Sequence, residues 1–115
     1  MPYARRIMRL TFLGTGTSMG VPVIGCECAV CTSPDPHNKR LRTSALLEAD
    51  GKAILFDAGP DLRQQALAAG IRRVDAVLLT HAHADHIFGL DDLRPLNFAQ
   101  RAAIPLYGTA NTLAM

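Results

Sequence analysis

The order of hydrophobic and polar residues predicts β-strands in the first half of the chain. Residues 7–13 alternate well enough to form one strand. Residues 43–49 and 52–57 are two further β-like runs. They are separated by Asp50-Gly51, and this dipeptide between apolar runs is the strongest short signal for a β-hairpin.

A helix and another strand are expected next. Pro60-Asp61 is typical of a helix start, and Gly70 is typical of a helix end. Residues 74–79 form a nearly continuous apolar run, which predicts a strand that is buried on both faces. The apolar face of the predicted helix would consist of Leu62, Ala66, Leu67 and Ala69.

The remaining segments predict shorter elements. Residues 91–100 have a helical pattern, so Pro95 must lie in the first turn or kink the helix. Residues 104–107 resemble a short strand, and Thr109 is placed to cap a final helix. Residues 14–20 are a glycine-rich tight loop without the lysine and spacing of a P-loop, which makes them a weak phosphate-binding signal.

The histidines are concentrated directly after the predicted apolar strand. Residues two apart in an extended segment point the same way, so His81 and His83 can converge on one metal ion. Asp85 and His86 are neighbours whose side chains should diverge, with Asp85 near a helix N-terminus. The segment can thus serve two ions, one through His81 and His83 and one through Asp85 and His86. These ligands suit Zn²⁺, and also Mn²⁺ or Fe²⁺.

Asp57 lies at the end of the strand before the predicted helix. A carboxylate at such a strand end could orient a metal-bound histidine by contacting the imidazole and not the metal. It could equally well be the residue that caps the helix. Spacing alone does not separate these two interpretations.

Three cysteines, Cys26, Cys28 and Cys31, lie within one polar, proline-containing segment at residues 26–42. An odd number of closely spaced cysteines is a poor disulfide framework, but their C-x-C-x-x-C spacing suits a tetrahedral zinc site that needs one more ligand. His37 is the nearest candidate for that ligand, and a residue from elsewhere is the other. Unmetallated surface thiols are the alternative.

Size and composition restrict the possible classes of protein. The 115 residues suffice for one modest domain, and 49% hydrophobic residues with 19% charged residues are typical of a globular protein. A net charge of +2 is too small to indicate a nucleic-acid partner. No apolar run approaches the roughly 20 residues that cross a bilayer, and no signal-peptide core follows Arg5, Arg6 and Arg9. We therefore expect a cytoplasmic protein.

Three segments, at residues 10–16, 56–59 and 80–86, resemble the metallo-β-lactamase superfamily, and the resemblance covers nearly the whole chain. Their sequences are Leu-Thr-Phe-Leu-Gly-Thr-Gly, Phe-Asp-Ala-Gly and Thr-His-Ala-His-Ala-Asp-His. Residues 25–31, together with 35–38 and 42–44, are most similar to the branch of phosphoribosyl 1,2-cyclic phosphate phosphodiesterases. They resemble tRNA 3′-processing endonucleases more loosely.

This resemblance implies an α/β fold, the N-terminal half of a four-layer αββα sandwich. Residues 1–115 would form a partial domain with a Cys-rich loop at 25–42, and the C-terminal half would be absent. The first ion would be held by His81 and His83, and the second by Asp85 and His86, which would be the catalytic residues. Asp57 matches a family carboxylate that contacts a metal ligand and not the metal itself. Cys26, Cys28 and Cys31 match three ligands of a structural zinc whose fourth ligand is a C-terminal histidine, which argues against His37.

The resemblance also implies a metal-dependent phosphodiesterase acting on a cyclic ribose phosphate or similar small phosphodiester. A hydroxide bridging two divalent ions, Zn or Mn, would attack phosphorus. Because the family's remaining ligands belong to the second half, we expect this chain alone to be inactive. We also expect its uncovered apolar sheet to produce a homo-oligomer or a swapped dimer, with neither a membrane nor a nucleic acid as partner.

Two other interpretations stay open. One is a thioester or lactam hydrolase of the same superfamily, although the cysteines and the Arg-Thr-Ser segment at 42–44 favour the phosphodiester branch. The other is a non-catalytic metal-binding or assembly module, in which the metal is structural.

Overall fold

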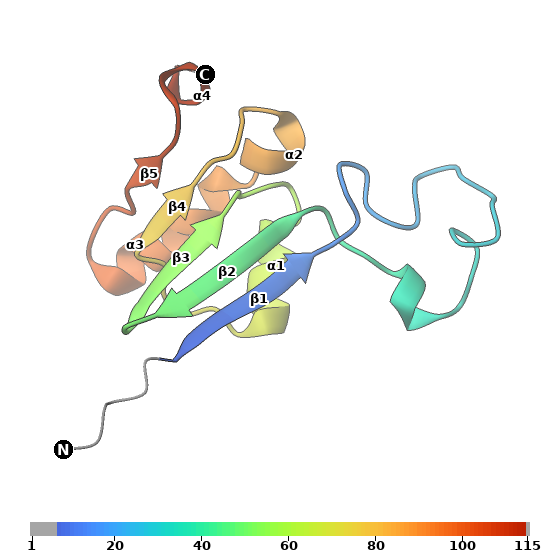
Figure 1. Cartoon of the computed structure of the whole chain (residues 1–115), viewed down its shortest axis with the longest axis horizontal. Coiled ribbons are helices and arrows are strands. Elements are labelled where there is room, and N and C mark those ends of the chain that lie inside the picture. Colours follow the sequence, from blue (N-terminus) through green and yellow to red (C-terminus); the bar gives the residue numbers. More distant parts are fainter. Residues whose placement is uncertain (1–6, 115) are drawn as a thin grey trace.

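A computed structural model describes residues 7–114, which form one five-stranded mixed sheet with helices against one of its faces (Figure 1). The strands follow one another in space as they do in sequence. The pairs β1–β2 and β2–β3 are antiparallel, whereas β3–β4 and β4–β5 are parallel. The strands are β1 (Met8–Gly14), β2 (Ser44–Ala49), β3 (Lys52–Phe56), β4 (Ala76–Leu78) and β5 (Leu106–Tyr107).

The turn between β2 and β3 confirms the predicted hairpin. Asp50 and Gly51 have φ angles of 50° and 74°, the left-handed conformation at both central positions that a type I′ turn requires. Ala49 therefore pairs with Lys52 directly across the turn, and this pairing fixes the register of the two strands.

The ends of α1 and the start of α4 agree with the predicted signals, whereas the helix predicted at residues 91–100 is divided into a 3₁₀ helix and a shorter α-helix. Gly70, at φ 66°, caps the C-terminus of α1, Pro95 lies in the first turn of α3, and Thr109 caps α4 by accepting a hydrogen bond from the Thr112 N–H. The elements are η1 (Pro36–Asn38), α1 (Leu62–Ala69), α2 (Ala84–Ile87), η2 (Leu90–Leu93), α3 (Arg94–Gln100) and α4 (Ala110–Leu113). Within the described residues, no helix is long and apolar enough to span a membrane.

The predicted apolar face of α1 is only partly correct. Leu62 is buried, but Leu67 and Ala69 are exposed, while the polar Gln65 is almost completely buried. Gln65 is buried because its Nε2 donates a 2.7 Å hydrogen bond to the Arg42 carbonyl where the Cys-rich loop returns to the sheet. The packing of α1 is therefore decided partly by a polar contact that periodicity does not reveal.

The prediction of a strand buried on both faces at residues 74–79 is wrong. The strand is the shorter β4, and only its middle residue, Val77, is fully buried. Side chains alternate between the faces of a strand, and only one face of this sheet is covered by helices α1 and α3, which lie behind it in Figure 1. The hydrophobic core lies on that covered side and includes Leu46, Leu55, Leu62, Val77 and Leu93.

Asp75, just before β4, joins the sheet to the loop that precedes it. Its Oδ2 accepts a hydrogen bond from the Ala53 N–H at 2.7 Å, and its Oδ1 accepts two from the Arg73 guanidinium. Burial raises the pKa of Asp75, but these hydrogen bonds outweigh it and hold the pKa below the ordinary value of 3.8.

We expect Asp75→Asn to destabilise the fold near neutral pH by about 1–3 kcal/mol, because the charged acceptor is lost. A carboxyl group whose pKa is depressed on folding stabilises the protein above its unfolded pKa, and that contribution disappears as pH falls through the folded value. The difference between the wild type and the variant should therefore shrink once the pH drops below 3.8. Urea denaturation at several pH values measures this, and a difference independent of pH would contradict it.

Candidate metal centre

The parallel pairing of β3 with β4 brings their C-terminal ends together at one edge of the sheet. Asp57 follows β3 directly, and the segment from Thr80 to His86 follows β4. The Asp57 N–H donates to the Leu78 carbonyl at 2.9 Å, which continues the ladder beyond the last strand pair. The predicted site residues of these two segments are thus neighbours in space.

Asp57 is a buried carboxylate surrounded by hydrogen-bond donors. Its Oδ1 accepts from the Thr80 N–H at 2.8 Å, and its Oδ2 accepts from the Thr80 hydroxyl at 2.7 Å. The same Oδ2 lies 2.7 Å from Nδ1 of His86. Asp57 does not cap α1, whose N-cap position is Asp61. Its positive φ of 62° is a conformation that Asp tolerates better than most residues.

The backbone after Asp57 packs directly against α2. The Ala58 N–H donates to the His86 carbonyl at 2.8 Å, and the Ala58 carbonyl accepts from the Gly89 N–H at 2.8 Å. A Cβ atom on Gly59 would overlap the Asp85 carbonyl oxygen. Glycine at this position therefore allows the close approach that places Asp85 and His86 beside Asp57.

The three imidazole rings of the motif lie next to one another. The ring centroids of His81 and His83 are 4.4 Å apart, in an edge-on arrangement, and those of His81 and His86 are 4.0 Å apart. His83 has an extended backbone at the N-cap position of α2, and Asp85 lies in the first turn, as predicted. The extended-to-helix change thus brings all three rings to one place.

Asp85 and His86 do not diverge, contrary to the expectation for adjacent side chains. Asp85 Oδ2 lies 2.8 Å from Nε2 of His86. Adjacent residues are about 100° apart around a helix, an angle that follows from the 3.6 residues per turn and that a carboxylate and a long imidazole side chain can bridge. The two side chains therefore meet on one side of α2.

The donor atoms of Asp85 and His86 fit a divalent cation. Nδ1 of His86 faces the acceptor-only Oδ2 of Asp57, so Nδ1 carries the ring proton. Nε2 of the same ring faces the Asp85 carboxylate, whose Oδ2 is 2.8 Å away. A proton on Nε2 or a metal ion bound to both atoms satisfies this contact, and an imidazole nitrogen with a carboxylate oxygen is a ligand pair that suits Zn²⁺.

The ligand atoms of the histidine motif do not converge on a single point. In the described part of the chain, the cysteines are the only group of at least three His, Cys, Asp or Glu side chains whose ligand atoms lie within 4.8 Å of one another. The motif residues instead contact one another in series: the ring of His83 lies beside that of His81, His81 beside His86, and His86 beside Asp85.

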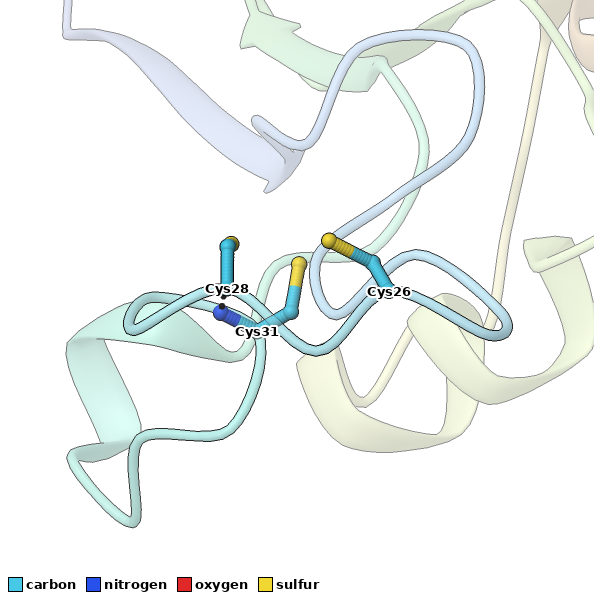
Figure 2. A group of neighbouring side chains, drawn as sticks. All are labelled: Cys26, Cys28 and Cys31. Atoms are coloured by element: carbon cyan, nitrogen blue, oxygen red, sulfur yellow. Dashed lines mark hydrogen bonds between the residues drawn. The ribbon is translucent and has the colours of Figure 1, made fainter.

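The cysteine side chains do converge on one point, as Figure 2 shows. The Val23 N–H donates to Sγ of Cys31 at 3.3 Å, and the Cys31 N–H donates to Sγ of Cys28 at 3.4 Å. The Cys31 N–H, helped by contacts with the other two thiols, lowers the pKa of Cys28 to about 7. The Val23 N–H lowers the pKa of Cys31, but burial and the neighbouring thiols outweigh it and raise the pKa overall.

His37 is not part of the cysteine group. Its exposed ring lies with Nδ1 2.9 Å from Asp35 Oδ1. The loop that carries the cysteines extends away from the sheet (Figure 1), and its return is fixed by an ion pair of 3.0 Å between Arg42 and Asp61. The cysteines are therefore held on the loop at a place separate from the histidine motif.

A family profile described as a beta-lactamase superfamily domain matches residues 52–115, which include the histidine motif and Asp57. The chain belongs to this superfamily. The mixed α/β fold, predicted as the N-terminal half of the metallo-β-lactamase sandwich, is also confirmed by likeness to solved structures.

One curated relative and two solved structures illustrate what this chain is similar to. The octanoyltransferase of Porphyromonas gingivalis is 56% identical over 107 residues, which cover 92% of this chain but 21% of that protein. A diphosphatase from the PhnP family is 54% identical with a TM-score of 0.87, covering 94% of this chain and 45% of that one. Zn²⁺-bound PqqB from Methylobacterium extorquens is 31% identical with a TM-score of 0.75, covering 94% and 39%. This chain thus spans less than half the length of each.

Sequence reasoning did not assign a role to Thr80 or Gly59. Both lie inside the segments that resemble the superfamily, Thr80 immediately before His81 and Gly59 two residues after Asp57. A hydroxyl beside a ligand and a glycine beside a strand-end carboxylate were the available signals. Neither signal says which residue the hydroxyl or the glycine contacts.

Proposed function

We propose that the protein is a metal-dependent phosphodiesterase whose substrate is a cyclic ribose phosphate or a similar small phosphodiester. The observation that carries this proposal is the buried Asp57 carboxylate, bonded to His86 beside Asp85 and close to the other two imidazoles. Superfamily membership supports a hydrolase. The likeness to a PhnP-family diphosphatase supports a phosphorus centre as the target.

The residues divide into holding and supporting roles. His81 and His83 would hold one divalent ion, Zn or Mn, and Asp85 and His86 the other. Bound ions would neutralise charge on a phosphoryl group and make water a better nucleophile. Asp57 keeps the ring proton of His86 on Nδ1, and Gly59 lets the backbone of α2 approach.

Each proposed ion has two protein ligands from this chain, so we expect the 115-residue polypeptide alone to show no turnover. The test is to express this chain and, separately, the longest open reading frame that contains it. Both are assayed with phosphoribosyl 1,2-cyclic phosphate, bis(p-nitrophenyl) phosphate, a thioester and a lactam. Metal-dependent phosphodiester hydrolysis by the longer product, lost in His81→Ala, is the expected result.

Two outcomes would contradict the proposal. Hydrolysis of only the thioester or the lactam would favour another activity of the superfamily. No hydrolysis of any substrate by a metal-loaded longer product would favour a non-catalytic metal-binding or assembly module. Robust turnover by the 115-residue chain would contradict only its expected inactivity.

A diphosphate substrate is the second candidate. It is favoured by the 54% identity to a protein that is named a diphosphatase. A nucleoside diphosphate sugar in the same assay separates the two, because it contains a P–O–P bond and no cyclic phosphodiester.

We also propose that Cys26, Cys28 and Cys31 hold a structural zinc. This is supported by their convergent Sγ atoms and by the N–H groups that approach two of the sulfurs. We expect Cys28→Ser to lower the zinc content of purified protein by about one ion per chain. Elemental analysis measures this, and Glu27→Gln in the same loop is the control. An unchanged zinc content in Cys28→Ser would contradict the proposal.

A homo-oligomer of the isolated chain is proposed from the uncovered sheet face. Met8, Leu10 and Phe12 of β1 are 71%, 51% and 70% exposed, and the register places Leu10 and Phe12 beside Leu47 and Ala45 of β2. Such an apolar surface favours association with a second copy. Sedimentation at micromolar concentration should reveal dimers or larger species, and Phe12→Lys should shift the protein toward monomer, whereas Phe98→Lys on α3 should not. A stable wild-type monomer would contradict this.

A further inference from the structure

Thr80 lies between the buried carboxylate and the first histidine of the motif. Its hydroxyl oxygen is 2.7 Å from Asp57 Oδ2 and 2.9 Å from Nδ1 of His81. Its backbone N–H donates to the other carboxylate oxygen of Asp57 at 2.8 Å. Both the main chain and the side chain of Thr80 are therefore held by Asp57.

These contacts determine where the protons lie. A hydroxyl has one proton to donate, whereas an ionised carboxylate can only accept. The Thr80 proton must therefore point to Asp57, which leaves the hydroxyl oxygen as an acceptor for His81. Nδ1 of His81 then carries the ring proton, and Nε2 of the neutral ring keeps its lone pair.

The same carboxylate oxygen, Asp57 Oδ2, also contacts the imidazole ring of His86. His86 donates its Nδ1 proton directly to Asp57 Oδ2, and its Nε2 faces Asp85, the other proposed ligand of the same ion. His81 and His86 are assigned above to different ions. Asp57 would thus orient one proposed ligand of each ion. It contacts His86 directly and His81 through the Thr80 hydroxyl.

We propose that Thr80 is a positioning residue that fixes the tautomer and orientation of His81, so that Asp57 controls ligands of both metal ions. This inference rests on the proposed function, since it assumes that His81 is a metal ligand. Thr80 contacts neither the ion nor a substrate in this role. Its hydroxyl acts as a polar link of fixed direction between Asp57 and the imidazole.

The wild-type chain without metal provides the first test. In ¹⁵N NMR of the imidazoles at a pH where His81 is neutral, His81 should carry the proton on Nδ1. This measurement requires no variant and does not depend on whether any metal binds. A proton on Nε2 of His81 would overturn the proposal.

Variants provide the second test. Thr80→Val removes the hydroxyl at nearly constant shape, so His81 should shift toward the Nε2–H tautomer while His86 stays unchanged. Thr80→Ser should restore the wild-type pattern. The affinity for Mn²⁺ is measured from the EPR signal of the free ion. It should fall about tenfold in Thr80→Val, the usual loss when a hydrogen-bond partner of a metal-bound histidine is removed. In Thr80→Ser it should stay near the wild-type value.

Thr11→Val on β1 is the matched control, because Thr11 pairs with Leu46 and is not a hydrogen-bond partner of Asp57, His81 or His86. Equal tautomers and equal Mn²⁺ affinity in Thr80→Val and the wild type would overturn the proposal. Failure of the wild type to bind Mn²⁺ would instead contradict the proposed metal centre, and the tautomer of His81 would still decide the role of Thr80. Circular dichroism shows whether each variant folds. If Thr80→Val does not fold, the ¹⁵N NMR spectrum of the wild type decides whether His81 carries its proton on Nδ1.

Discussion

Asp57→Asn is expected to lower the affinity of the histidine motif for Mn²⁺ by about 10–100-fold, the usual loss when the partner of a ligating histidine is changed. The carboxylate accepts three hydrogen bonds, from the Thr80 N–H, the Thr80 hydroxyl and His86 Nδ1. An amide has only one oxygen, and its NH₂ group would face a donor. At least one partner therefore loses its acceptor, and His86 or His81 loses its fixed tautomer.

Asparagine is a suitable replacement because it tolerates the left-handed backbone of Asp57 better than alanine does. The loss can thus be assigned to the carboxylate rather than to backbone strain. Mn²⁺ is the appropriate probe because it favours nitrogen and oxygen ligands over the thiolates of the cysteine cluster. Asp75→Asn is the control: it removes another carboxylate that accepts a backbone N–H, but it lies away from the histidines. Equal Mn²⁺ affinity in Asp57→Asn and Asp75→Asn would contradict a role for Asp57 behind the ligands.

Gly59→Ala is expected to destabilise the protein by roughly 3 kcal/mol, the upper part of the range for inserting a methyl group into a packed region. The new Cβ would overlap the Asp85 carbonyl oxygen, which is backbone and cannot rotate away. The chain can relieve the overlap only by moving α2. Such a shift would stretch the hydrogen bond of 2.8 Å between the Ala58 N–H and the His86 carbonyl.

Chemical denaturation measures the stability of Gly59→Ala, and Mn²⁺ titration shows whether the ligands moved. Gly108→Ala is the matched control, because the nearest atom to its Cβ would be the Leu79 carbonyl oxygen at 3.3 Å, so that a small adjustment suffices. We expect that variant to lose much less stability and to bind Mn²⁺ normally. If Gly59→Ala were as stable as Gly108→Ala, the close packing of α2 on residues 57–59 would not be required for the fold.

Local features of the fold could be predicted because they depend on neighbouring residues. The Asp50-Gly51 turn, the Gly70 cap and the position of Pro95 each follow from the backbone conformations that these residues adopt easily. Burial was predicted less well. Gln65 is buried and Leu67 is exposed, because the return of the Cys-rich loop, distant in sequence, supplies the acceptor for the Gln65 amide.

The sequence by itself determined the kinds of candidate ligand atom and their local order. The extended spacing of His81 and His83, the helix that begins beside Asp85, and the cysteine spacing all follow from short stretches of chain. Tertiary structure alone decided which residue hydrogen-bonds to these candidate ligands. Asp57 is 29 positions away from His86, and its two possible roles could not be separated until the parallel pairing of β3 and β4 brought the ends of the strands together. Pairing of this kind depends on contacts between residues that are far apart in the chain, so the partners of Asp57 could not be identified from the amino-acid pattern around it.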